Sequence, residues 1–170
     1  PLSNLLLTLY NLSIPTFAVV EGDVYGGGLG IIAACDFIYA LEMVKFALSE
    51  TRLGLIPATI APFIISRVGG GHSRELFMCS RGIDAARAKE IGLITQVFCH
   101  PTDLNNFLDL DCSAILKSAP GALKETKALH RFLSNTKPNS ETSQYTAEVL
   151  AERWENSEAE IGINAFLKKE

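Results

Sequence analysis

The order of a short apolar stretch, a run of glycines and a helix of small residues restricts the possible folds of this chain more than any other feature. Thr16 to Val20 is apolar and rich in β-branched residues, Gly26 to Gly28 forms a turn, and Leu29 to Cys35 predicts a helix. Asp36 to Leu41 then predicts a second apolar strand. This order is typical of a βαβ unit, and it indicates an α/β fold with a buried sheet.

The remaining elements follow from periodicity and from capping residues. Leucines at helical spacing predict a helix from Leu2 to Leu12, Lys45 to Leu48 predicts a third strand, and Ser49 to Pro57 predicts a loop. Beyond this loop, Pro62 fits the first turn of a helix and Gly69 to Gly71 predict its end. Ser73 and Asp84 are expected as N-caps, Gly92 as a C-terminal glycine, and Leu93 to Phe98 as the last strand.

The second part of the chain predicts helices alone. They are expected over residues 103–117, 120–133, 139–156 and 158–168, the last introduced by a capping box of Ser157 with Glu160. We therefore expect a core over residues 1–100 and a helical region over residues 101–170.

Composition excludes several classes of function. With 170 residues, 48% of them hydrophobic, the chain can bury a sizeable core. Its net charge of −4 offers no positive surface for nucleic acid or for an anionic membrane. The four cysteines are far apart and include no C-x-x-C pair, so we expect reduced core thiols of an intracellular protein and no metal site. They are Cys35, Cys79, Cys99 and Cys112.

Two features are candidates for chemistry. Glycines at Gly26 to Gly28 let a polar atom approach the backbone, and the free N–H groups of a helix start suit an oxygen that gains negative charge. The alternative is that these glycines only allow close packing, and their spacing to Gly30 does not fit a dinucleotide fingerprint. Glu50 follows the apolar residues Phe46 to Leu48, a setting that suits a carboxyl for proton transfer, although a solvated or ion-paired glutamate fits as well.

Longer runs of sequence resemble the enoyl-CoA hydratase/isomerase (crotonase) family. The likeness is strongest from Ile14 to Asp36 and in Ser-Glu-Thr-Arg-Leu-Gly-Leu-Ile-Pro-Ala, which ends at Ala58, and it continues in Ala85 to Ile94, Ser118 to Lys124 and Gly162 to Lys168. The resemblance implies a crotonase-like α/β fold of stacked ββα turns with a C-terminal helical region. It also implies that the N-terminal part of the family domain precedes Pro1, together with one of two oxyanion-hole donors.

The same resemblance assigns roles to residues. It implies that the Gly27 N–H is the other oxyanion donor and that Glu50 is the carboxylate that moves a proton. Tyr25, Gly26 and Pro57 are expected to border the substrate. Phe166 and Lys169 are expected beside coenzyme A, and Arg52 beside a carboxylate at the far end of the acyl chain. Ordinary members carry a second glutamate at the position of Gly30, so this position is expected to be empty here.

The implied reaction is the addition of water across the 2,3 double bond of an enoyl-CoA thioester. The run around Glu50 is most similar to methylglutaconyl-CoA hydratases of leucine breakdown. A Δ3,Δ2-enoyl-CoA isomerase and a non-catalytic scaffold of the same fold remain alternatives. The resemblance further implies homotrimers or hexamers in the bacterial cytoplasm or the mitochondrial matrix. It implies no cofactor, because coenzyme A belongs to the substrate.

Overall fold

The protein, described here by a computed structural model, consists of two compact units, Pro1–Asp111 and Cys112–Glu170. The structure describes residues 1–134 and 136–168. The division falls within α5 (Pro101–Ile115), the helix that begins at the end of the expected core. The second unit continues with α6 (Pro120–Leu133), α7 (Ser140–Trp154) and α8 (Ser157–Lys168).

The first unit repeats a pattern of two strands followed by a helical segment. Its elements are α1 (Leu2–Asn11), β1 (Phe17–Val20), β2 (Val24–Tyr25), α2 (Gly27–Ala33), β3 (Phe37–Leu41), β4 (Lys45–Ala47), the 3₁₀ helix η1 (Glu50–Leu53), α3 (Ala61–Cys79), β5 (Ile83–Asp84), α4 (Ala85–Glu90) and β6 (Gln96–Phe98). The strands form two sheets, with the orders β1-β3-β6 and β2-β4-β5, and β1 to β4 alternate between them. The first sheet is parallel throughout, with Phe17 opposite Phe37 and Tyr39 opposite Gln96. This arrangement is the expected stack of ββα turns.

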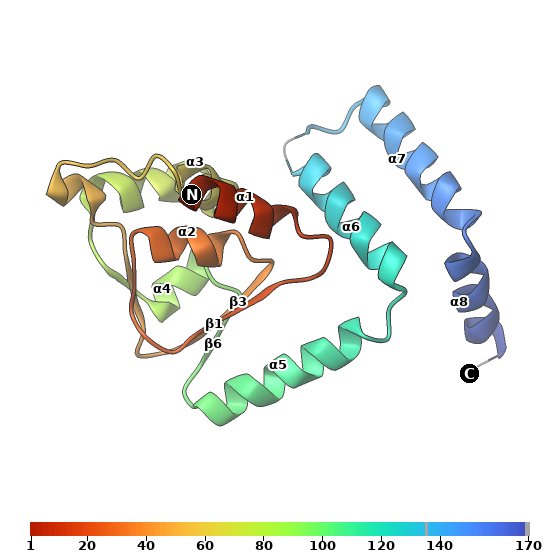
Figure 1. The fold of residues 1–170 in the computed structure, drawn as a ribbon, viewed down its shortest axis with the longest axis horizontal. Helices are drawn as coiled ribbons and strands as arrows, with labels where there is room; N and C mark the ends of the chain where they lie inside the picture. The colour runs from red at the N-terminus through yellow and green to blue at the C-terminus, as the bar shows by residue number, and fades with distance from the viewer. Residues whose placement is uncertain (135, 169–170) are drawn as a thin grey trace. The chain divides into compact units, whose positions relative to one another are not determined.

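Apolar residues of both strands and helices form the core of this unit. Leu29 of α2, Ile38 of β3 and Ile64 of α3 are fully buried. Figure 1 shows α2 and α4 on one side of the strands β1, β3 and β6, with α5 on the other. Across the sheet, Tyr39 meets Phe107 of α5 edge to face, with ring centroids 5.5 Å apart. The core therefore fixes the start of α2 relative to the ends of the strands.

Several expected boundaries are wrong. Helix α2 begins at Gly27 and not at Leu29, because the glycines supply its first turn. The expected loop after β4 contains the 3₁₀ helix η1, and the last strand covers only Gln96–Phe98. The short strands β2 and β5 were not expected, since two residues are too few to show a period.

Capping residues were predicted with mixed success. Asp84 accepts a hydrogen bond from the Arg87 N–H at 2.8 Å, and Gly92 has a positive φ of 77°, so both predictions are confirmed. Gly69 has the non-helical angles φ 73° and ψ 169° and separates two helical segments of α3, so the predicted helix end is confirmed. Ser73 lies buried inside the second segment and is not its N-cap, so that prediction is wrong. The Asn156 side chain, and not Ser157, accepts from the first turn of α8, at the Glu158 N–H.

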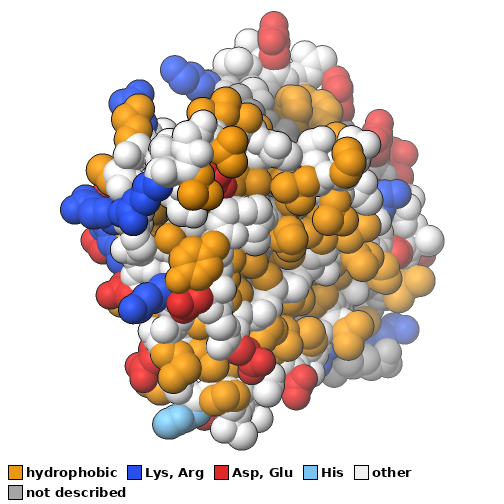
Figure 2. All heavy atoms as spheres, turned by 60° about the vertical axis from the view of Figure 1, so that its left-hand side comes forward, with side chains coloured by type: hydrophobic (Ala, Val, Ile, Leu, Met, Phe, Trp, Pro, Cys, Tyr) orange, Lys and Arg blue, Asp and Glu red, His pale blue; other side chains and the backbone are white. Residues whose placement is uncertain are grey.

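The surface is apolar in places and bears three of the cysteines. Figure 2 shows hydrophobic side chains gathered over much of one face, with Lys and Arg side chains mostly along one side of it. All four cysteines are free thiols, but only Cys35 is buried, so the expectation of core thiols is wrong for Cys79, Cys99 and Cys112. Cys79 is the last residue of α3, Cys99 follows the end of β6, and Cys112 lies on α5. None of the three belongs to the buried core. No helix among the described residues is both long and apolar enough to cross a membrane.

Candidate active site

The glycine turn brings free backbone donors to the surface of the first unit. Gly26 has φ 50° and ψ −119°, a conformation that residues with a Cβ rarely adopt. Its N–H donates to the Ala47 carbonyl of β4 at 3.1 Å, and its carbonyl accepts from the Leu29 N–H at 2.9 Å. The N–H groups of Gly27 and Gly28 belong to the first turn of α2, where a helix offers no internal acceptor. Two adjacent amides are therefore available to an oxygen atom.

Glu50 lies directly against this turn. It is the first residue of η1, and a Cβ built on Gly26 would be 3.4 Å from its Oε1. The other oxygen, Oε2, is buried and has no hydrogen-bond partner among the described residues. A buried carboxylate oxygen without a partner is costly, and such atoms need an explanation such as a ligand or a catalytic role. The predicted pair of Glu50 and the glycine turn is thus brought together.

No carboxylate stands at Gly30, as expected from the sequence, but the space beside it is filled. Gly30 is buried one helical turn beyond Gly26, and a Cβ there would be only 2.3 Å from Ile60 Cγ2. Ile60 is 3% exposed and comes from the segment that connects η1 to α3. An isoleucine therefore fills the space in which a side chain at position 30 would stand. Sequence reasoning missed Ile60, because a single apolar residue in a predicted helix start carries no signal for a site.

Tyr25 and Asp23 stand at the outer edge of the turn. Tyr25 is exposed, and its hydroxyl donates to Asp23 Oδ2 at 3.2 Å. This hydrogen bond, together with the charge of Asp23, raises the pKa of the Tyr25 phenol above its ordinary value. Asp23 also accepts from the Lys45 N–H at 2.8 Å. Asp23 thus has a structural role in joining β2 to β4.

The remaining predicted residues differ in how far they approach the site. Pro57 is half-buried, and its carbonyl accepts from the N–H groups of Ile60 and Ala61. Arg52 is exposed on η1, and no ion pair joins it to any carboxylate in the described part of the chain. Phe166 is 81% exposed on α8 in the second unit, and Lys169 lies outside the described residues.

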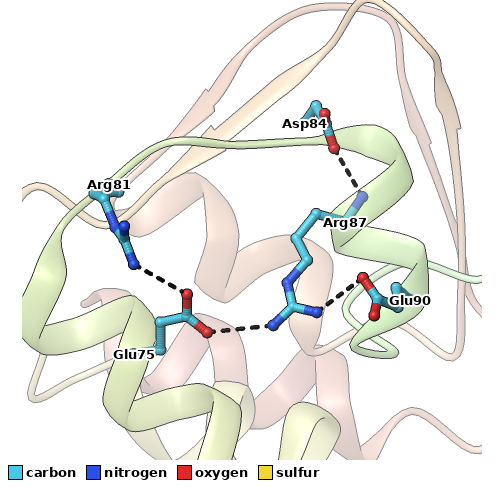
Figure 3. A network of polar contacts seen from close by, with 5 residues as sticks. All are labelled: Glu75, Arg81, Asp84, Arg87 and Glu90. Atoms are coloured by element: carbon cyan, nitrogen blue, oxygen red, sulfur yellow. Dashed lines mark hydrogen bonds and ion pairs between the residues drawn. The ribbon is translucent and has the colours of Figure 1, made fainter.

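A cavity of about 230 Å³ lies elsewhere in the first unit, between α3 and β5. Figure 3 shows the polar network beside it: Glu75 pairs with both Arg81 and Arg87, at 3.3 Å each, and Arg87 also pairs with Glu90 at 2.8 Å. The hydrogen bond to Glu90 raises the pKa of Arg87. Two carboxylates balance two guanidinium groups here, and no predicted site residue lines the cavity. Over residues 1–134 and 136–168, no group of His, Cys, Asp and Glu could hold a metal ion.

Comparison with known proteins gives consistent results. The crystal structure of an enoyl-CoA hydratase from Shewanella pealeana superposes with a TM-score of 0.93 at 31% identity, over 99% of this chain and 62% of that one. Enoyl-CoA isomerase/hydratase fer4 of Mycosarcoma maydis is 37% identical over 74% of this chain and 46% of its own length. Mitochondrial methylglutaconyl-CoA hydratase of mouse is 38% identical over 51% of this chain and 28% of its own length.

The chain thus spans less than two thirds of the length of each of these three relatives. The fold of the relatives is the crotonase fold, and the stacked ββα turns of the first unit agree with it. A sequence profile of the family described as enoyl-CoA hydratase/isomerase matches residues 1–170. The chain therefore belongs to the enoyl-CoA hydratase/isomerase family.

Proposed function

We propose that this chain carries the proton-transferring carboxylate and one oxyanion donor of an enoyl-CoA hydratase. The observation that supports this most is the buried Oε2 of Glu50, which has no partner among the described residues and belongs to a carboxylate lying against the Gly26 turn. A group that must accept and release a proton needs an oxygen that no structural hydrogen bond occupies. The adjacent N–H of Gly27 is the donor for the thioester oxygen.

The proposed reaction uses these two groups in order. Glu50 removes a proton from water while the water oxygen forms a bond to C3 of the enoyl thioester, and the C2–C3 π electrons move toward the thioester oxygen. The Gly27 N–H stabilises the resulting enolate. Glu50 then returns the proton to C2, so the product contains one added water. Water and thioester balance the equation by themselves, and coenzyme A enters only as part of the substrate.

An isomerase is the second candidate. Glu50 could equally remove a proton from C2 of a 3-enoyl thioester and return it to C4, with no water added, and the Mycosarcoma maydis relative is named isomerase/hydratase. The two reactions differ in one absorbance measurement. A hydratase removes the conjugated enoyl thioester, an isomerase produces it from the 3-enoyl compound, and a non-catalytic scaffold does neither.

For the acyl group, we propose a chain with a terminal carboxylate of the methylglutaconyl type. Two observations support it: the exposed guanidinium of Arg52 has no ion-pair partner among the described residues, and one relative is named methylglutaconyl-CoA hydratase. Equal turnover of crotonyl-CoA and of a glutaconyl-type thioester would contradict this part of the proposal.

We also propose that copies of the chain associate, as trimers or hexamers. Large apolar side chains on α7 and α8 support this, because Leu150, Trp154 and Ile161 are all more than half exposed. Light scattering on the protein would give its assembly mass.

Glu50→Gln tests the catalytic proposal. Glutamine keeps the shape of the side chain but cannot carry a proton, so kcat should fall about a hundred- to ten-thousand-fold, the usual range for a general acid/base. Binding of a saturated acyl-CoA should change far less, since the thioester oxygen is held by an amide. The assay should use the native polypeptide that contains this chain.

Glu21→Gln is the matched control. Glu21 is an exposed glutamate just before the glycine turn, and its substitution should leave kcat within about twofold, as is usual for surface changes away from a site. A Glu50→Gln protein with full activity would remove the proposal. A loss seen only with Glu21→Gln would move the chemistry to the other side of the turn.

A further inference from the structure

The segment that carries Glu50 has few anchors. Between the end of β4 and the start of α3, residues 51–56 are all exposed, including the apolar Leu53 and Ile56. Thr51 hydrogen bonds through its hydroxyl to Ser80 Oγ and to the Phe77 carbonyl, which ties η1 to the far end of α3. Ile60, at 3% exposed, is the most deeply buried side chain from residue 49 to the start of α3. The position of Glu50 over the glycine turn therefore depends on how these anchors are held.

Ile60 packs into a space that only glycine can leave open. A Cβ on Gly30 would be 2.3 Å from Ile60 Cγ2, 2.9 Å from Ile60 Cβ and 3.3 Å from Leu6 Cδ1. Real Cβ atoms essentially never approach other atoms within 3.0 Å, so any side chain at position 30 would push Ile60 outward. The two residues are complementary in shape.

The same helix thus receives both ends of the segment. Gly26 and Gly30 are four residues apart, which is about one turn or roughly 6 Å along a helix. The Glu50 carboxylate lies against the first glycine and the Ile60 side chain against the second. A shift of Ile60 along or away from α2 would therefore shift Glu50 relative to the Gly27 N–H. The first turn of α2 also contains no acidic residue that could share the proton transfer.

We propose that Ile60 is a positioning residue for Glu50. Its side chain, seated in the space left by Gly30, fixes the segment of residues 50–60 on α2 and so sets the distance between the carboxylate and the oxyanion donor. Because the first turn of α2 holds no acidic residue and Ile60 fills the space beside Gly30, Glu50 alone removes and returns the proton. This inference rests on the proposed function and adds to it the pair Gly30 and Ile60, which sets the position of Glu50 relative to the oxyanion donor.

Gly30→Ala is the direct test. The added methyl group would lie 2.3 Å from Ile60 Cγ2 and must displace Ile60 by about 1 Å, and a displacement of that size at a reacting group can cost about a hundredfold in rate. We expect kcat to fall by about this factor while KM changes less than about threefold. Binding of butyryl-CoA, a saturated thioester that cannot be hydrated, should be nearly unchanged by calorimetry. A merely structural role would not separate kcat from binding in this way.

The second variant relieves the closest contact. Ile60→Ala in the Gly30→Ala background removes the Cγ2 atom that lies 2.3 Å from the added methyl group. The Cβ atom that remains, at 2.9 Å, needs a shift of only about 0.1 Å to reach 3.0 Å, so kcat should recover at least about tenfold over Gly30→Ala alone. Ile60→Ala by itself should lower kcat, since the segment loses its anchor. If Gly30→Ala does not fold, Ile60→Ala alone is the test: its kcat should fall while its binding of butyryl-CoA stays nearly unchanged.

Val68→Ala controls for a general loss of stability. Val68 is buried two turns further along α3, and it is not among the atoms nearest to the Gly30 position. Its truncation should lower Tm while kcat stays near the wild-type value. An equal loss of kcat in Val68→Ala and Gly30→Ala, or no recovery in the double variant, would overturn the positioning role. The positioning role and the proposed function can fail separately. If the wild type is active, Glu50→Gln is inactive and Gly30→Ala is fully active, the positioning role of Ile60 is wrong and the proposed function stands.

Discussion

The two units of the chain are stabilised in different ways. Every buried apolar residue belongs to the first unit, the last of them being Leu104 of α5. In the described part of the second unit, residues 112–134 and 136–168, Thr142 is the one buried residue. Its helices are joined by polar contacts, such as those of Arg153 with Glu125 and Glu158, and by a ring contact between Phe132 and Tyr145, whose centroids are 4.5 Å apart. One unit is organised around a core, the other around ion pairs and exposed apolar helix faces.

This difference indicates which unit can hold catalytic groups in fixed positions. A carboxylate must keep its position to within a fraction of an ångström, and close-packed cores resist displacement better than surface ion pairs do. The glycine turn begins α2, which the core of the first unit holds, and Glu50 lies three residues after the end of β4, whose Phe46 is fully buried. The second unit presents apolar side chains to its surroundings, which suits binding more than catalysis.

The largest expected effect comes from truncating one leucine in each unit. Leu104→Ala, at 0% exposed, should lower the free energy of unfolding by about 3 kcal/mol, because it leaves a cavity in the core. Leu150→Ala, at 63% exposed on α7, should change it by less than about 0.5 kcal/mol. Urea denaturation of both variants measures the two values. An equal loss of unfolding free energy in both variants would contradict the difference between the two units. A loss for Leu150→Ala that rises with protein concentration would show that α7 is buried between copies of the chain.

A partly buried cation provides the second test, which measures how far the first unit also depends on polar contacts. Arg67 of α3 donates from Nε to the Leu93 carbonyl at 2.7 Å, and from Nη1 to the Cys35 carbonyl at 2.7 Å. Burial lowers the pKa of this guanidinium. Arg67→Met should cost about 2 kcal/mol in the same denaturation experiment, since it leaves carbonyls without donors. Arg67→Lys should recover only part of this, because one ammonium group cannot span both acceptors.

An Arg67→Met cost well above that of Leu104→Ala would contradict the view that apolar packing dominates this unit. A cost near zero would mean that water replaces the lost donors.

Much of the fold could be predicted from the sequence, because its elements carry strong local signals. The helix over residues 120–133 was predicted with its exact bounds from Pro120 and the apolar spacing, and the strand start at Lys45 was also correct. The errors concern positions where tertiary packing overrides a local signal. The helix end predicted at Gly69 to Gly71 agrees with the non-helical Gly69, but Ser73, the predicted N-cap, lies inside the helical segment that follows, in which Leu76 packs into the core.

The site was predicted less completely. Glu50 and the glycine turn follow from their residue types and from the family resemblance, and the geometry brings them together. Ile60 could not be predicted, because its role depends on a contact with Gly30 across 30 residues of sequence. The bulky side chain of Ile60 fills the space that the absent side chain of Gly30 leaves, and only the three-dimensional structure shows this.

The smallest expected effect concerns pH and the second unit. Glu158 of α8 accepts a hydrogen bond from the Gly121 N–H at the start of α6, at 3.2 Å, and pairs with Arg153 of α7. One carboxylate thus joins three helices. The backbone hydrogen bond, followed by Arg153, lowers the pKa of Glu158 below its ordinary value.

The sign of the pH effect follows from this lowered pKa. A carboxylate that is favoured in the folded state contributes stability in full above its unfolded pKa of about 4.3, and this contribution is lost as pH falls through the lower folded pKa. The protection factor of the Gly121 amide, which compares its exchange with that of an unfolded chain at the same pH, should therefore fall below about pH 4, while amides of β3 in the core stay protected. Glu158→Gln should remove this pH dependence, because glutamine accepts the hydrogen bond without titrating. Glu160→Gln, an exposed position two residues further along α8, is the matched control and should behave as the wild type does. A protection factor at Gly121 that is constant from about pH 3 to pH 6 would show that the ion pairs do not hold these helices together. In that case the second unit would have to be ordered by its apolar faces after all.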